Sequence, residues 1–253
     1  MWLEERVGQL IMTGFEGTTV SDVLRSTIED SHIGNVILFS SNISSTKQLQ
    51  QLNDEILNLN TEYPIWIAVD EEGGNVSRIP SELVTLPTAA TLASNYTSEQ
   101  VFNLSSHLSL LLHALGFTID FAPVIDVNSN PNNPVIGTRA FSDNPETVSE
   151  YAISFNDGLR EHSILGVGKH FPGHGDTNVD SHYGLPVINK TLEQLKVNEL
   201  IPFQNAIDSN FEMLMVGHLF IPSLDSKYPA SQSGKIMNDL LREDMGEIGR
   251  AHV

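Results

Sequence analysis

Short apolar runs alternate with longer amphipathic segments along most of this chain. The short runs are rich in Val, Ile, Leu and Phe without polar alternation, which is typical of parallel strands covered on both faces. The longer segments repeat apolar positions at helical spacing, and several begin with a Ser or Thr cap and an acid, as in Thr97-Ser98-Glu99. The predicted strands are Leu10–Phe15, Val36–Phe39, Ile65–Val69, Phe117–Ile125, Leu165–Val167 and Met213–Val216, and the predicted helices are Val20–Ser31, Thr46–Asn60, Ser98–Leu115, Glu146–His162, Leu192–Ser209 and Lys235–Met245.

This alternation predicts an α/β fold with a parallel sheet, either a closed barrel or an open doubly wound sheet. Asp70, Asp126, Lys169 and His218 each follow a different apolar run, and (β/α)8 barrels assemble their active sites from several strand ends. An open sheet would gather ligand groups at one switch point, and no GxGxxG motif follows the first strand. We therefore expect a TIM (β/α)8 barrel that is incomplete, because about six βα units can be counted.

Composition narrows the choice of partners. The 253 residues include 13 Lys and Arg against 32 Asp and Glu, a net charge of −19, which disfavours nucleic acid and anionic membranes. No cysteine is present, so thiolate nucleophiles and disulfides are excluded. No apolar run is long enough to span a membrane, and Met1–Gln9 is too charged for a signal peptide. The sequence as it stands predicts a cytoplasmic protein, and export would require a leader ahead of Met1.

The stretch Gly166–Pro186, GVGKHFPGHGDTNVDSHYGLP, carries the strongest chemical signal. A buried strand ends in a polar loop whose glycines and prolines exclude an ordinary helix. Within it, Asp180 lies two residues from His182, so an extended loop can place both side chains on one side. The carboxylate would orient the imidazole and raise its pKa, giving a general acid usable near neutral pH. The alternative is a turn-capping Asp beside an exposed His.

Other strand ends supply further candidates for binding. Lys169 and His170 follow a buried strand and are expected to point into the barrel mouth; otherwise the lysine reaches solvent and the histidine bonds to backbone carbonyls. Asp70 can accept hydrogen bonds from ligand hydroxyls or belong to a charged turn. Arg139 is either a bidentate anchor or a partner for Asp143.

A metal site is the competing chemistry. His and Asp residues in this stretch, with His218, include enough ligand types for zinc or two metals. The first strand has no His-x-His pair and the chain has no HExxH helix. A cation such as Lys169 beside a metal would also be repelled. We therefore favour acid–base chemistry with no metal and no cofactor.

Together these segments resemble glycoside hydrolase family 3, in its β-N-acetylglucosaminidase (NagZ-type) branch. The resemblance covers nearly the whole chain, although Asn75 stands where an Arg commonly follows the Glu-Gly-Gly. The Asp-Ser-His loop is specific to this branch. The segments that carry the resemblance are KHFPGHGD (169–176), DSH (180–182), VDEEGG (69–74), FAPVIDV (121–127) and NPVIGTRAF (133–141).

The resemblance implies retaining hydrolysis that removes a β-linked N-acetylglucosamine from the non-reducing end of a carbohydrate. His182 paired with Asp180 would be the acid/base, in place of the family's usual second carboxylate. By the same motifs, the sugar would be bound by Asp70, Arg139, Lys169 and His170. Asp126 and His218 would line the pocket, while His174 and Asp176 would shape the loop.

The resemblance also implies a nucleophilic aspartate at the end of the next strand, and no Asp of this chain matches that motif. The tail 247–253, EIGRAHV, has no strand character and matches the in-frame translation of a sequencing adapter. We therefore expect a partial family 3 barrel over residues 1–246, a non-native tail over 247–253, and negligible hydrolysis by the chain as written.

Other functions remain open at this stage. A barrel that has lost its nucleophile could bind sugar without catalysis, and an imidazole acid/base would allow phosphate to replace water, giving a phosphorylase. The expected substrates are N-acetylglucosamine-containing peptidoglycan fragments or chitooligosaccharides.

Overall fold

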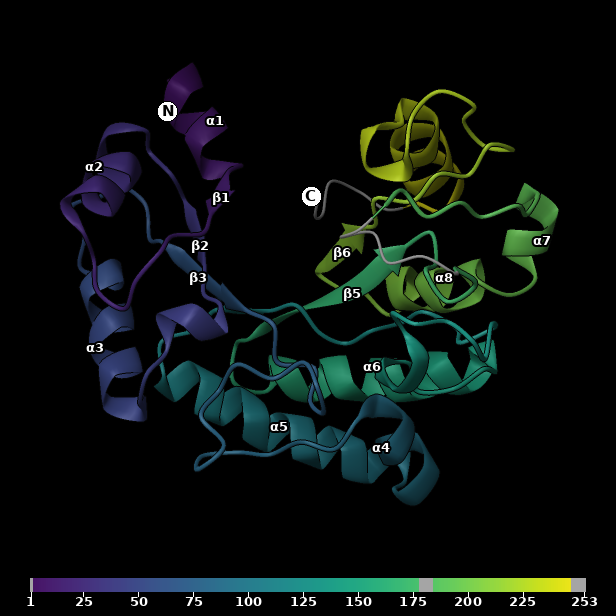
Figure 1. Ribbon diagram of the computed structural model, residues 1–253, viewed down its shortest axis with the longest axis horizontal. Coiled ribbons are helices and arrows are strands. Elements are labelled where there is room, and N and C mark those ends of the chain that lie inside the picture. The colour runs from purple at the N-terminus through teal and green to yellow at the C-terminus, as the bar shows by residue number, and fades with distance from the viewer. Residues whose placement is uncertain (1, 178–183, 247–253) are drawn as a thin grey trace.

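The computed structural model describes residues 2–177 and 184–246, which form a curled, six-stranded parallel sheet covered by helices (Figure 1). The strands pair in chain order, so each strand lies beside the one before it. This is the expected incomplete barrel. The strands are β1 (Met12–Thr13), β2 (Asn35–Ile37), β3 (Trp66–Val69), β4 (Ile119–Asp120), β5 (Leu165–Phe171) and β6 (Met213–Val216).

Helices cover the outer face of this sheet. Side-chain caps fix several of their starts, because Ser21, Ser45, Thr97 and Asn144 each accept hydrogen bonds from backbone N–H groups of the first turn. Figure 1 shows α5 and α6 lying side by side beneath β5. The helices are α1 (Leu3–Gln9), α2 (Asp22–Asp30), α3 (Thr46–Leu57), α4 (Ala89–Asn95), α5 (Ser98–Ala114), α6 (Pro145–Arg160), α7 (Leu192–Lys196) and α8 (Leu200–Asp208), with short 3-10 turns η1 (Ser40–Asn42), η2 (Gly137–Arg139) and η3 (Ala230–Gln232) and the π-helix η4 (Lys235–Asp244).

The expected strands are confirmed in number and order, and most bounds differ by a few residues. Two predicted elements differ more substantially. The helix expected over Leu192–Ser209 is two helices, α7 and α8, which are separated by a turn over residues 197–199. Pro202 lacks an N–H and is tolerated only in a first turn, which favours a new start at Leu200. The strand expected over Phe117–Ile125 shortens to Ile119–Asp120, and Pro123 provides no donor to continue the ladder.

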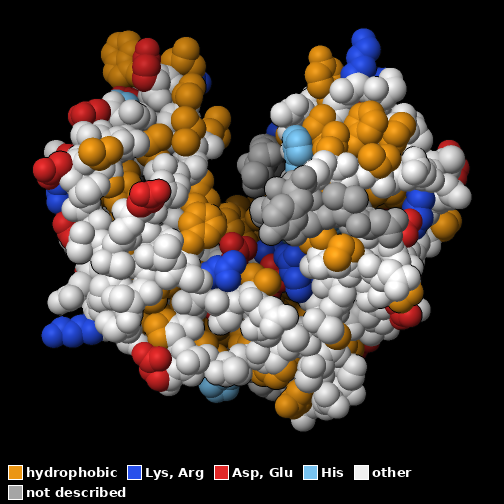
Figure 2. Space-filling view, viewed as in Figure 1, with side chains coloured by type: hydrophobic (Ala, Val, Ile, Leu, Met, Phe, Trp, Pro, Cys, Tyr) orange, Lys and Arg blue, Asp and Glu red, His pale blue; other side chains and the backbone are white. Residues whose placement is uncertain are grey.

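The sheet separates two apolar layers. Alternate strand residues such as Val36, Ile67 and Leu214 face the helices and join the main core. The other set points into the barrel, where Ala68, Ile119, Phe121 and Val167 form a smaller cluster flanked by partly buried methionines. Figure 2 shows the resulting hollow between the two halves of the molecule, with charged side chains at its base.

Within the described residues, no helix combines the length and the apolar character that a bilayer span requires.

Candidate functional site

The carboxyl ends of β3, β4 and β5 bring charged side chains together at the mouth of the half-barrel. Asp70 and Glu72 follow β3, while Lys169 and His170 are the fifth and sixth residues of β5. Parallel strands end at one edge of a sheet, so residues about 100 positions apart in the sequence become neighbours. Arg139 reaches the same place from η2.

Lys169 is the centre of this cluster. Its ammonium Nζ lies 2.9 Å from Asp70 Oδ1 and 2.5 Å from Glu72 Oε1. The Lys169 and Glu72 side chains are almost fully buried, with 3% and 4% of their surface exposed. Asp70 keeps 18% of its side-chain surface exposed, so it can still present an oxygen to a ligand. Lys169 therefore fixes the orientation of the Asp70 carboxylate and neutralises the more deeply buried Glu72.

Glu72 also holds Arg139 through one edge of its guanidinium. Arg139 Nε donates to Oε2 at 2.8 Å and Nη2 donates to Oε1 at 2.7 Å, a bidentate pair. The carboxylate that Arg139 pairs with is Glu72, which the sequence did not suggest, rather than Asp143, and 21% of the Arg139 side chain stays exposed. The outer edge of the guanidinium is thus held in a fixed orientation at the mouth.

The cations around Glu72 lower its pKa. Burial acts to raise the pKa of Glu72, but the charge of Lys169 and the hydrogen bonds from Arg139 oppose it and lower the pKa from 4.5 to about 2. A lowered pKa in the folded state contributes stability above the unfolded-state value, and that stability is lost as pH falls. Glu72 should therefore contribute to an acid-sensitive fold.

We expect Glu72→Gln to reduce the free energy of unfolding by roughly 2–3 kcal/mol at pH 7, because the amide cannot neutralise two cations. The difference from the native chain should shrink between about pH 5 and pH 2, where Glu72 itself becomes protonated in the unfolded and then the folded chain. Urea unfolding at several pH values measures this. Glu150→Gln, at an exposed position of α6, is the matched control, and a pH-independent defect would rule out this account.

A second cluster is built on Asp126, which is fully buried behind the mouth. Its Oδ2 lies 2.7 Å from His170 Nδ1, and its Oδ1 accepts a 2.6 Å hydrogen bond from the backbone N–H of His174. The carboxylate therefore orients the His170 ring, of which 16% is exposed, with Nε2 directed away from Asp126. A histidine held in this way can donate or accept one hydrogen bond at the mouth.

The start of the polar loop after β5 is anchored by buried groups. His174 Nδ1 lies 2.7 Å from Thr177 Oγ1, and Asn133 Nδ2 donates to the His174 carbonyl at 2.8 Å. Burial lowers the pKa of His174, against the opposing charge of Asp126, which favours a neutral structural ring. This agrees with the expectation that His174 shapes the loop.

The far side of the loop is tied to α8 by an ion pair network. Lys190 Nζ lies 3.0 Å from Asp176 Oδ2 and 2.5 Å from Glu199 Oε1. Glu199 is fully buried and also accepts a hydrogen bond from Ser129. Burial acts to lower the pKa of Lys190, but the hydrogen bonds that its ammonium donates to these two carboxylates raise that pKa. Asp176 thus has a structural partner, as expected.

The expected acid/base pair, Asp180 and His182, lies outside the described residues. His218, the weaker candidate at the end of β6, is exposed, and its Nδ1 lies 2.7 Å from Ser231 Oγ. In the described part of the chain, no group of three or more His, Asp or Glu side chains is arranged to hold a metal ion.

Two functional features were missed at the level of sequence. Glu72 was expected to have no role beyond its place in the VDEEGG segment, yet it joins Lys169 to Arg139. Asp126 was expected only to line the pocket, yet it organises His170 and His174. Their positions in the sequence could have indicated these roles. Both acids follow predicted apolar strands, as do Asp70 and Lys169, which were chosen as site residues.

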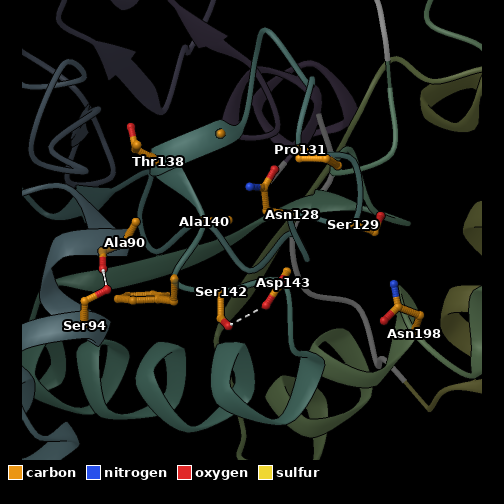
Figure 3. A pocket seen from close by; sticks show the side chains of 12 residues that line it. Ala90, Ser94, Asn128, Ser129, Pro131, Thr138, Ala140, Ser142, Asp143 and Asn198 are labelled. Atoms are coloured by element: carbon orange, nitrogen blue, oxygen red, sulfur yellow. Dashed lines mark hydrogen bonds between the residues drawn. The ribbon is translucent and has the colours of Figure 1, made fainter.

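A second hollow, of about 540 Å³, lies beside the loop that carries η2 (Figure 3). It shares Gly137 and Thr138 with the segment that ends at Arg139. Its described lining is mostly neutral and polar, with Asp143 the only charge, in contrast to the ion pairs of the mouth. The described residues that line it are Ala90, Ser94, Asn128, Ser129, Pro131, Gly137, Thr138, Ala140, Phe141, Ser142, Asp143 and Asn198.

Comparison with known protein families identifies the family of this chain. The family model described as "Glycosyl hydrolase family 3 N terminal domain" matches residues 2–250. The chain belongs to glycoside hydrolase family 3. Beta-hexosaminidase A of Pseudoalteromonas piscicida is 35% identical over 252 residues, covering 92% of this chain and 42% of the relative. The expected family is thereby confirmed.

Solved structures of the family share the same curled sheet. A family 3 β-N-acetylglucosaminidase from Paenibacillus sp. str. FPU-7 superposes with a TM-score of 0.92 at 34% identity, over 97% of this chain and 48% of that protein. NagZ from Neisseria gonorrhoeae, solved with N-trifluoroacetyl-D-glucosamine, gives 0.88 at 32% identity, over 94% and 71%. The chain spans less than half the length of the Pseudoalteromonas and Paenibacillus proteins.

Proposed function

We propose that this chain provides the sugar-binding half of a retaining β-N-acetylglucosaminidase that removes a terminal N-acetylglucosamine from peptidoglycan fragments or chitooligosaccharides. The observation that carries the proposal is the Lys169 cluster. Asp70 and Arg139 are held by buried partners and keep exposed edges at the mouth, beside the oriented ring of His170. A carboxylate, a guanidinium and an imidazole fixed around one hollow suit the dense hydroxyls of a sugar ring.

Asp180 and His182 are assigned to proton transfer on the strength of their motif. As imidazolium, His182 would protonate the leaving oxygen, and as neutral imidazole it would deprotonate water in the second step. Asp180 would orient the ring and stabilise its charged form. No aspartate of this chain matches the family's nucleophile motif, so the proposal places the nucleophile on none of its residues.

Binding is the direct test. Titration of the ¹⁵N-labelled chain with N-acetylglucosamine should shift amide resonances around Lys169 and His170, weakly but saturably, with glucose less effective. Asp70→Asn should weaken this binding about 10- to 100-fold, because a hydrogen bond to a charged group contributes about 1.5–3 kcal/mol. Asp54→Asn, exposed on α3, is the control. Equal responses to glucose and N-acetylglucosamine, or no effect of Asp70→Asn, would count against the proposed site.

Hydrolysis of a chromogenic β-N-acetylglucosaminide by this chain should be negligible, with or without added phosphate, because the proposal gives it no nucleophile. Product analysis distinguishes the alternatives, since free sugar indicates hydrolysis and sugar 1-phosphate indicates phosphorolysis. Robust turnover would show that one of the present carboxylates acts as nucleophile.

A further inference from the structure

Asp120 is a fully buried carboxyl group to which the sugar-binding proposal gives no role. It is the last residue of β4 and pairs with Val69 in the parallel ladder, at the level where β3 ends and the segment Asp70–Glu72 begins. The charged groups that act on it are Glu71 and Asp70 from the β3 end and Lys169 from β5. A carboxyl group at this depth requires a physical reason, because an unpaired charge is costly to bury.

Hydrogen bonds connect Asp120 to the chain segment that carries the mouth acids. Its Oδ1 accepts the backbone N–H of Glu71 at 2.9 Å. Glu71, also fully buried, uses Oε2 to accept the backbone N–H groups of Arg78 and Ile79 at 2.8 and 3.0 Å. The two acids therefore fix both ends of the loop between residues 71 and 79 from behind.

The remaining oxygen of each acid is buried without a partner. Asp120 Oδ2 and Glu71 Oε1 make no hydrogen bond within the described part of the chain. An ionised carboxylate in this position would leave an anionic oxygen uncompensated, whereas a neutral carboxyl group would not. Lys169 cannot serve as a dedicated counter-ion, because its ammonium already contacts Asp70 and Glu72.

We propose that Asp120 is a positioning residue that, as a neutral carboxylic acid, holds the Glu71 backbone so that the flanking Asp70 and Glu72 both reach Lys169. Successive side chains of an extended segment point to opposite sides. With Glu71 turned toward Arg78 and Ile79, Asp70 and Glu72 are turned toward the mouth. The role of these two acids in binding sugar rests on the function proposed above; their positioning by Asp120 does not.

The surroundings support the neutral form. Burial raises the pKa of Asp120 well above its ordinary value, and the charges of Glu71 and Asp70 add to this, against the Glu71 N–H and the charge of Lys169. Burial likewise raises the pKa of Glu71, against the hydrogen bonds from Ile79 and Arg78. A raised folded-state pKa gives a stability contribution that is present at low pH and lost as pH rises through it. The pH dependence of this stability contribution is therefore opposite in sign to that of Glu72, whose pKa is lowered.

Carboxyl ¹³C titrations of the native chain, Asp120→Asn and Asp120→Ala test the inference without any ligand. In the native chain, Asp120 should keep its protonated chemical shift at pH values well above its ordinary pKa. Asp120→Asn mimics the neutral acid and should leave the pKa of Glu72 at about 2. Asp120→Ala should raise the pKa of Glu72 by a unit or more, because Glu72 then moves relative to Lys169. Asp54→Asn serves again as the control.

Sugar binding gives the second readout. Asp120→Asn should bind N-acetylglucosamine within about twofold of the native chain, and Asp120→Ala at least tenfold more weakly. Failure of the native chain to bind would refute the sugar proposal alone, since the titrations still report on positioning. An Asp120 that ionises near its ordinary value, or an unchanged Glu72 in Asp120→Ala, would overturn the inference. If Asp120→Ala does not fold, an Asp120→Asn chain with a displaced Glu72 pKa would overturn it equally.

Discussion

Replacing Lys169 with methionine should lower the free energy of unfolding by about 3–5 kcal/mol. Methionine preserves the apolar stem but removes the ammonium that lies against Asp70 and Glu72. Removing one partner of a buried ion pair leaves an uncompensated charge, which is far more costly than the pair is worth. Arg139 would still neutralise Glu72 in part, so we expect a weakened fold with a displaced Asp70.

Chemical unfolding of Lys169→Met at pH 7 and pH 4 measures this effect. The defect should be smaller at pH 4, because a Glu72 that has lost Lys169 becomes protonated more easily. Lys47→Met, exposed on α3, controls for the change of side chain. A Lys169 defect of equal size at both pH values would show that packing, and not charge, is responsible.

Gly175→Ala should destabilise the chain by more than about 3 kcal/mol or prevent folding. A Cβ at this position would lie 1.6 Å from the carbonyl oxygen of Val127, which is backbone and cannot rotate away. The loop after β5 would have to separate from the loop after β4, with loss of the 2.6 Å contact between His174 N and Asp126. Overpacking of rigid groups typically costs about 1–3 kcal/mol and more where no side chain can yield.

Gly234→Ala is the matched control for this substitution, because the nearest atom to its Cβ would be Asn238 Nδ2 at 3.7 Å. Thermal unfolding followed by circular dichroism should show a loss of roughly 6–12 °C for Gly175→Ala and little change for Gly234→Ala. An unaltered midpoint for Gly175→Ala would mean that the two loops are not in this close contact.

The fold could be predicted from hydrophobic pattern because its elements are local. Met213–Val216 has the same bounds in the sequence prediction and in β6, and β3 differs from its prediction by one residue. The bend between α7 and α8 was missed because periodicity continues across it, although Pro202 marks it. Helix α4 was also missed, since its apolar face spans only two turns.

The candidate site was predicted less completely because its contacts are not local. The motifs located Asp70, Arg139, Lys169 and His170, which the structure brings to one mouth. Glu72 could not be recognised as the partner that joins Arg139 to Lys169, since Arg139 is 67 residues away and its contact depends on the tertiary path of η2. Only the contacts between strand ends distinguish Glu72 from the adjacent Glu71. The Glu71 side chain points away from the mouth and accepts hydrogen bonds from the backbone of Arg78 and Ile79.

The agreement between strand order and chain order has a consequence for synthesis on the ribosome. Each strand can dock onto one already made, so the sheet can grow as the chain emerges. Lys169 follows Asp70 by 99 residues, which is about 5–20 s at ordinary translation rates. Until then both mouth acids remain hydrated and without their shared cation. The charged cluster at the mouth, and with it the sugar site proposed above, is therefore completed only after β5 has been synthesised.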